Sequence, residues 1–161
     1  MKTLIINSKT HGICNVLLDD EDYENVIKHK WFVIKTGKYV YAARWHYGEK
    51  NIMILLHRMI NKTPIGFVTD HKNRNSLDNQ KHNLRTATVS QNAANIKSQE
   101  NSTSQFLGVY WETRRNKWFV TIKSNKKNKF IGRFDEEVEA AKAYDKAAIE
   151  CHGEFANLNF K

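Results

Sequence analysis

Cysteine is scarce in this sequence, and long apolar runs are missing. The two cysteines, Cys14 and Cys151, lie far apart, and neither belongs to a Cys-x-x-Cys pair. The sequence therefore predicts neither a zinc ribbon nor a dithiol redox motif, and two isolated cysteines fit a reducing compartment better than a disulfide framework. No stretch reaches the roughly 18 apolar residues of a membrane span, and residues 1–7 are too short for a signal peptide. We expect an intracellular, cytoplasmic protein with no membrane partner.

Acidic side chains are outnumbered by basic ones. The chain of 161 residues has 26 Lys and Arg against 17 Asp and Glu, a formal net charge of +9. This balance suits a polyanionic partner, most simply nucleic acid. Net charge indicates how a protein associates and does not predict its fold. Residues 105–133 carry eight basic side chains and one acid, Glu112, whereas residues 134–155 are rich in acids. The region therefore has one strongly polarised face.

The first third of the chain reads as short strands. Residues 4–6, 31–34 and 39–42 are rich in β-branched and aromatic types, with a hairpin turn at 36–38. Acids at 19–22 mark a helix start, and residues 52–61 read as a strand passing into a short helix. The second half begins with a polar stretch over 93–104 that lacks periodicity and reads as a linker.

The last third predicts three strands and a helix. The strands span residues 106–111, 118–123 and 129–134, and the helix begins at Asp135 and stops at Gly153. Its apolar stripe is formed by residues that recur at steps of three or four: Val138, Ala141, Tyr144, Ala148 and Cys151. We expect an α+β protein in which a three-stranded antiparallel sheet packs one helix against its back.

Residues 70–92 hold the side chains that indicate chemistry. Asp70 and His71 follow an apolar strand at 66–68, a loop of Asn, Asp and Ser follows, and Asn83 begins a second strand. Thr88 is a suitable N-cap for a helix that carries Asn92. Strand, loop, strand and helix form a small unit that can bring Asp70, His71 and Asn92 around one point.

These residue types suit hydrolysis of a phosphodiester. The oxygens of Asp70 and Asn92 are hard donors for a Mg²⁺-like ion, which would stabilise the leaving 3′ oxygen. His71, with a reference pKa of about 6.5, suits the role of general base that takes a proton from water.

Asp70-His71, Asn83 and Asn92 together resemble the His-Asn-His (HNH) endonuclease motif in its single-metal ββα form. The separation of Asp70 from Asn92 is 22 residues, and residues 56–60 and 83–85 are also similar to phage and intron-encoded homing endonucleases of that family. The resemblance implies that His71 is the general base, that Asp70 and Asn92 hold the metal, and that Asn83 braces the loop and orients His71. Asn92 stands where some members have His, which favours Mg²⁺ or Mn²⁺ over zinc.

The basic and histidine residues around this motif are candidates for DNA contact. His57 either lines the site or touches phosphate, or it is a half-buried helix residue. Arg58 and Arg85 are expected at the DNA.

The C-terminal region resembles the Apetala/ethylene-response-factor type of DNA-binding domain. The matching pieces include Gly108-Val109, Lys117-Trp118, Ile131-Gly132 and Tyr144-Asp145. The resemblance implies a sheet that lies in the major groove. Tyr110 and Glu112 depart from the family, so its base-reading code does not transfer. We expect DNA contacts from cations and aromatics of the sheet region: Trp111, Arg114, Arg115, Trp118, Lys123, Lys129 and Arg133. The alternative for Trp118 is packing against the helix.

These observations predict an HNH nuclease module over 1–92, a linker over 93–104 and a DNA-binding module over 105–161. The expected partner is double-stranded DNA and not a small molecule, with the chain a monomer or weak dimer. One alternative is a DNA-binding regulator whose nuclease module is inactive. Another is an RNA-binding or RNA-cleaving protein, for which Trp111 and Trp118 would serve as base platforms.

Overall fold

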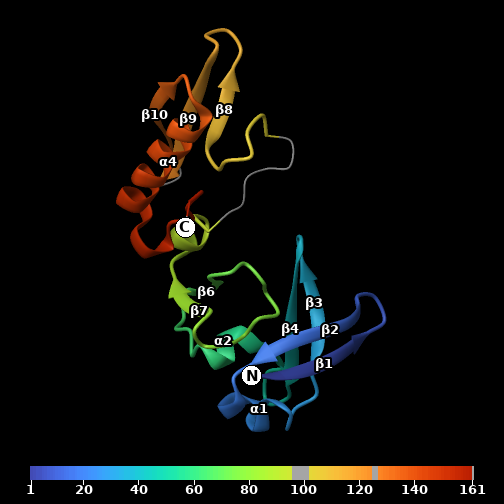
Figure 1. The fold of residues 1–161 in the computed structure, drawn as a ribbon. Coiled ribbons are helices and arrows are strands. Elements are labelled where there is room, and N and C mark those ends of the chain that lie inside the picture. Colours follow the sequence, from blue (N-terminus) through green and yellow to red (C-terminus); the bar gives the residue numbers. More distant parts are fainter. Residues whose placement is uncertain (96–101, 125–126, 161) are drawn as a thin grey trace. The chain divides into compact units, whose positions relative to one another are not determined.

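The chain folds into two compact units in a computed structural model that describes residues 1–95, 102–124 and 127–160. The first unit is Met1–Thr88 and the second is Val89–Lys161, and Figure 1 colours both along the sequence. The expected linker falls partly outside the described residues, at 96–101.

The first unit is built from three small antiparallel sheets and two short helices (Figure 1). One sheet is the hairpin of β1 (Lys2–Ser8) and β2 (Gly12–Leu18). The second has β4 (Tyr39–His46) between β3 (Phe32–Thr36) and β5 (Ile52–Leu55). The third pairs β6 (Val68–His71) with β7 (Leu84–Ala87). The helices are α1 (Asp20–Val26) and α2 (Leu56–Ile60).

Alternation along β2 shows why these segments form a core. Cys14, Val16 and Leu18 are buried while the residues between them are more exposed, as expected for a strand with one face against a core. They join apolar side chains from the other sheets and both helices in a single cluster: Ile6, Val26, Trp31, Ala42, Leu56, Ile60 and Leu84. The hairpin turn before β2 places Gly12 at a φ of +68°, which glycine adopts without strain.

The second unit consists of a short helix, a three-stranded antiparallel sheet and one long helix. Helix α3 (Val89–Asn92) precedes the sheet, in which β9 (Lys117–Ser124) lies between β8 (Val109–Glu112) and β10 (Lys127–Phe134). Helix α4 (Glu137–His152) covers one face of the sheet (Figure 1). Small residues on α4, among them Ala140, Ala141 and Ala148, pack with Val120 and Ile122 of β9, and their size permits close approach.

The structure confirms the α+β class and the expected three-stranded sheet with one helix. Three details differ. Strand β2 was not predicted from the sequence. Strand β6 runs over Val68–His71 and contains Asp70 and His71, whereas the prediction ended the strand before them. Helix α4 begins at Glu137, and Val138 is 47% exposed, so the predicted stripe is wrong at that residue. No helix in the described parts of the chain is long and apolar enough to cross a bilayer.

Candidate active site

Asp70 and His71 are adjacent residues of β6, and both are buried. The register of the hairpin places Asp70 opposite Arg85 and His71 opposite Leu84. Asp70 is 3% exposed, and its Oδ2 accepts hydrogen bonds of 2.7 Å from both Nε and a terminal nitrogen of Arg85. Both contacts are made to the same oxygen, so they hold Oδ2 of the carboxylate in place. Arg85, which the sequence analysis assigned to DNA, therefore orients Asp70 in this structure.

Asn83 holds the loop between β6 and β7 closed. Its Oδ1 accepts a hydrogen bond from the backbone N–H of Asn73 at 2.9 Å, and its Nδ2 donates to the carbonyl of Asp78 at 2.8 Å. The backbone N–H of Lys72 donates to the carbonyl of Asn83 at 2.9 Å. Asn83 is buried, so its amide replaces the solvent that these loop groups would otherwise need. The loop is thereby fixed immediately after His71.

Two strands distant in sequence hold the far side of the same loop. The N–H of Leu17 donates to the carbonyl of Leu77, and the N–H of Asn79 donates to the carbonyl of Leu17, both at 2.9 Å. Ser76 donates its hydroxyl to the carbonyl of Val40 at 2.7 Å. Strands β2 and β4 therefore position residues 76–79 beside β6.

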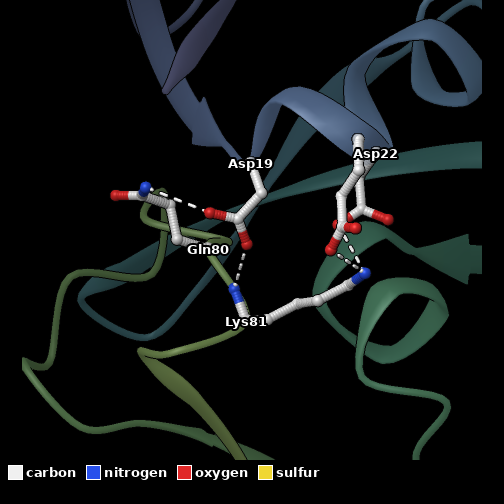
Figure 2. Close-up of polar contacts among 5 residues, drawn as sticks. Asp19, Asp22, Gln80 and Lys81 are labelled. Atoms are coloured by element: carbon white, nitrogen blue, oxygen red, sulfur yellow. Dashed lines mark hydrogen bonds and ion pairs between the residues drawn. The ribbon is translucent and has the colours of Figure 1, made fainter.

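The acidic start of α1 provides a further attachment, shown in Figure 2. The carboxylate of Asp19 accepts hydrogen bonds from the backbone N–H of Lys81 at 2.7 Å and from Nε2 of Gln80 at 3.2 Å. The Lys81 ammonium pairs with Glu21 and Asp22. Asp19, Glu21 and Asp22 form a cluster of carboxylates close enough to share a cation, but in this structure they hold the segment that leads into Asn83.

His71 lies in a cluster of aromatic rings. Its ring centroid is 5.2 Å from that of His57 and 6.3 Å from that of Tyr41. Burial lowers the pKa of His71, against the opposing effects of a hydrogen bond with Asn79 and of the charges of Asp70 and Asp78. An imidazole in such surroundings stays neutral at physiological pH, the form that can accept a proton.

His57 is the second histidine of this cluster. It lies in α2, is 6% exposed, and its ring is 5.0 Å from that of Tyr41. Burial, followed by the charges of His71 and Arg58, lowers its pKa to about 3. Because His57 is so deeply buried, little of its ring surface is accessible to a phosphate. The structure therefore favours the interpretation of His57 as a neutral ring that packs beside His71.

Arg58 and Asn92 are two other predicted residues, and both lie in short helices, as the sequence predicts. The guanidinium of Arg58 donates to the carbonyls of Phe67, Thr63 and Pro64 at 2.8 to 3.4 Å, so it fastens the turn that leads into β6. Asn92 is the last residue of α3 and belongs to the second unit. Its role as a metal ligand stays a prediction.

The seven predicted DNA-binding residues of the second unit divide between the two faces of its sheet and a turn. Trp111 pairs with Trp118 in the same register as Val109 with Val120, so both indoles share the face that α4 covers, and Trp118 packs against the core there. Lys129, opposite Ile122, shares this face. Arg114 and Arg115 lie in the exposed turn between β8 and β9.

Lys123 and Arg133 lie on the other, open face of the sheet, where the structure adds two residues that the sequence analysis missed. Phe119 and Phe130 stack with ring centroids 5.0 Å apart, and the Arg133 guanidinium lies 5.2 and 4.9 Å from these rings. The alternation around buried Val120 was the signal that could have placed Phe119 on this face.

Glu112 restrains the cations near this face. Its carboxylate accepts a hydrogen bond from Nε of Arg133 at 2.6 Å and pairs also with Arg115. The hydrogen bond from Arg133, followed by that from Arg115, lowers the pKa of Glu112. The acid that departs from the plant-type pattern therefore ties together two cations predicted to contact DNA.

Comparison with known proteins gives different relatives for different parts of the chain. No family model matches it. An APETALA2-like protein 2 of Oryza sativa subsp. indica is 40% identical over 57 residues, which are 35% of this chain and 13% of that protein. An AP2-like ethylene-responsive transcription factor of Arabidopsis thaliana is 39% identical over 57 residues, 35% of this chain and 12% of that protein.

The alignment with one viral relative covers most of both chains. An uncharacterized HNH endonuclease of Acanthamoeba polyphaga mimivirus is 30% identical over 136 residues, 83% of this chain and 68% of that protein. The match covers most of both chains, and Asp70, His71 and Asn83 lie on one buried hairpin. Both observations point to the same family. The chain belongs to the HNH endonucleases.

Proposed function

We propose that this chain is a metal-dependent endonuclease that hydrolyses phosphodiester bonds in double-stranded DNA. One observation supports this above the others: Asp70, bonded to Arg85, and His71 are consecutive buried residues of β6, and Asn83 braces the loop that follows. A carboxylate that can hold a metal ion and a neutral imidazole that can take a proton from water suit the hydrolysis of a phosphodiester.

In this proposal His71 is the general base. Burial lowers its pKa, so the ring is unprotonated at neutral pH and can take the proton of an attacking water. The Asp70 and Asp78 charges act in the opposite direction and stabilise the imidazolium once it forms. The rings of Tyr41 and His57 pack against that of His71, which limits the orientations that it can adopt.

The residues fit a Mg²⁺ or Mn²⁺ ion. Asp70 offers a buried carboxylate whose Oδ2 is bonded by Arg85, and the part of Asn92 as a second oxygen donor rests on the sequence motif alone. Oxygen donors of this kind suit hard divalent cations. Such an ion, when bound, supplies charge stabilisation at the scissile phosphate and at the leaving 3′ oxygen. The products would be a 5′-phosphate and a 3′-hydroxyl.

The second unit, in this proposal, supplies affinity and placement on the duplex. Lys123 and Arg133 lie on the open face of a sheet, and a sheet face of this size can enter a major groove. Residues 93–104 would connect the modules. The proposed setting is a phage or a mobile element. Relatives in Acanthamoeba polyphaga mimivirus and in Escherichia phage T7 support a viral source, and protein 3.8 of phage T7 is 31% identical over 96 residues, 59% of this chain and 78% of that protein.

The experiment that tests the proposal separates binding from cleavage. Purified protein is incubated with bacterial genomic DNA and Mg²⁺, and new ends carrying a 5′-phosphate and a 3′-hydroxyl are captured by ligation and sequenced. His71→Ala and Asp70→Asn should lower end formation by at least about 100-fold and retain duplex binding in a salt-titrated shift assay. His46→Ala, an exposed histidine of β4, is the matched control and should cut normally. Cleavage that survives either site variant contradicts the assigned roles, and wild-type binding without cleavage favours a DNA-binding regulator.

A further inference from the structure

A pocket of about 460 Å³ lies in the first unit, where the segment between α1 and β3 meets the end of β4. Its volume is within the range of pockets that hold small ligands. Neither Asp70, His71 nor Asn83 is among the residues that line it. The pocket is therefore separate from the candidate active site.

Aromatic rings form one part of its lining. Trp45 is 46% exposed, and the ring of Phe32 lies 6.4 Å from it, with 29° between the two planes. Phe32 thus supports the indole and holds it in place, while almost half of Trp45 remains open to solvent. Tyr47 is still more exposed and lines the same pocket. Large apolar rings that stay exposed on a folded domain commonly mark a binding surface.

Cations form the other part. Lys28, Lys30 and Arg44 line the pocket, and none of the described residues that line it is acidic. The Arg44 guanidinium lies 5.8 Å from the centre of the Trp31 ring, and Trp31 is itself fixed by a 2.7 Å hydrogen bond from its Nε1 to the carbonyl of Val26. The Nε of Arg44 is buried and has no hydrogen-bond partner within the described parts of the chain. A buried donor without a partner is costly unless a ligand satisfies it.

We propose that this pocket binds an unpaired nucleotide of a nucleic acid, with the base on Trp45 and Tyr47 and a phosphate beside Lys28, Lys30 and Arg44. Every base has a face that stacks on an aromatic ring, and a phosphate satisfies lysine and arginine donors together. The same combination of rings and cations is what proteins use to bind single strands. A base within a duplex is already stacked on both faces, so the ligand is a nucleotide outside the helix.

The first test locates the contact in the unaltered full chain. A thymidine hexanucleotide that carries one 4-thiothymidine is photo-cross-linked to the protein, and the modified peptides are identified by mass spectrometry. We expect cross-links within residues 28–47. Cross-links confined to the second unit would overturn the proposal, as would loss of the cross-link on addition of an excess of blunt duplex.

The second test measures the energetics with matched variants. Trp45→Leu should weaken binding of the hexanucleotide about fivefold or more, which is the lower end of the effect of removing one stacking ring. Lys30→Met should flatten the slope of log K against log salt by about 0.7, the contribution of one phosphate contact in a single strand. Lys9→Met, an exposed lysine of the same unit outside the pocket, should leave affinity and slope unchanged. Unchanged binding by Trp45→Leu, or equal effects of the two lysine variants, would refute the pocket. The proposal does not depend on DNA cleavage, so a chain that cuts no DNA can still pass both tests.

Discussion

Mild acid should destabilise the first unit through His57. Its pKa is lowered from 6.5 to about 3, first by burial. In the unfolded chain the ring regains its ordinary pKa, so between pH 6.5 and pH 3 the unfolded state binds a proton that the folded state does not. The contribution of neutral His57 to stability is therefore fully present above pH 6.5 and is lost as the pH falls toward 3.

The size of the effect follows from the shift. One pKa unit corresponds to about 1.36 kcal/mol, so the loss is about 2 kcal/mol at pH 5 and about 4 kcal/mol at pH 3. Burial also lowers the pKa of His71, which adds a loss of the same sign. Because small domains are stable by only about 5 to 15 kcal/mol, a loss of this size moves an unfolding transition clearly.

Urea unfolding at pH 7 and pH 5 measures the effect. The chain has four tryptophans, so replacing Trp111 and Trp118 by Phe leaves Trp31 and Trp45 to report on the first unit alone. In this background the parent should lose about 2 kcal/mol more between the two pH values than His57→Gln does. His46→Gln, which removes an exposed histidine, should lose as much as the parent. An equal pH-dependent loss in the parent and in His57→Gln would refute the reasoning.

Three further changes test other parts of the fold. Gly108→Ala should lower the melting temperature of the second unit and cost roughly 3 kcal/mol of folding free energy, because φ is +74° and a Cβ would overlap the Tyr144 ring of α4. Gly12→Ala is the control: its φ is also positive but the space around it is open, so it should cost only about 1 kcal/mol. Asp19→Ala should speed hydrogen exchange at the Lys81 amide, to which its carboxylate is bonded, and lower cleavage without lowering DNA affinity; an unchanged exchange rate would count against its positioning role. Glu112→Gln should release two arginines and make duplex binding tighter and more dependent on salt, and weaker binding would show that the carboxylate itself contributes to recognition.

The local sequence pattern predicts the residues of the candidate site better than it predicts the distant residues that hold the site in place. Asp70, His71 and Asn83 occupy a short segment in which chain order constrains their arrangement, so their element order follows from the residues themselves. The contact of Asp19 with Lys81 joins residues 62 positions apart, and Leu17 meets the loop at a comparable separation. The periodicity of neither segment predicts such a contact, because the contact arises only from tertiary packing.

Apolar spacing also predicts faces incompletely. Val138 fits a helical stripe by spacing but is exposed in the first turn of α4, whereas Ala140 and Ala147 are buried because small side chains allow the helix to approach the sheet. On the sheet, charge and aromatic content indicated binding residues but not their face. The register with Val120 places Trp118 on the covered side, a distinction that composition cannot make.

The most direct test of the nuclease is conversion of supercoiled plasmid by the full chain with Mg²⁺, with EDTA, and with His71→Ala in parallel. We expect nicked or linear plasmid with Mg²⁺, none with EDTA, and none with His71→Ala although that variant still binds DNA. Nicking that persists in EDTA or in His71→Ala would contradict the assignment of a metal-dependent site with His71 as its base.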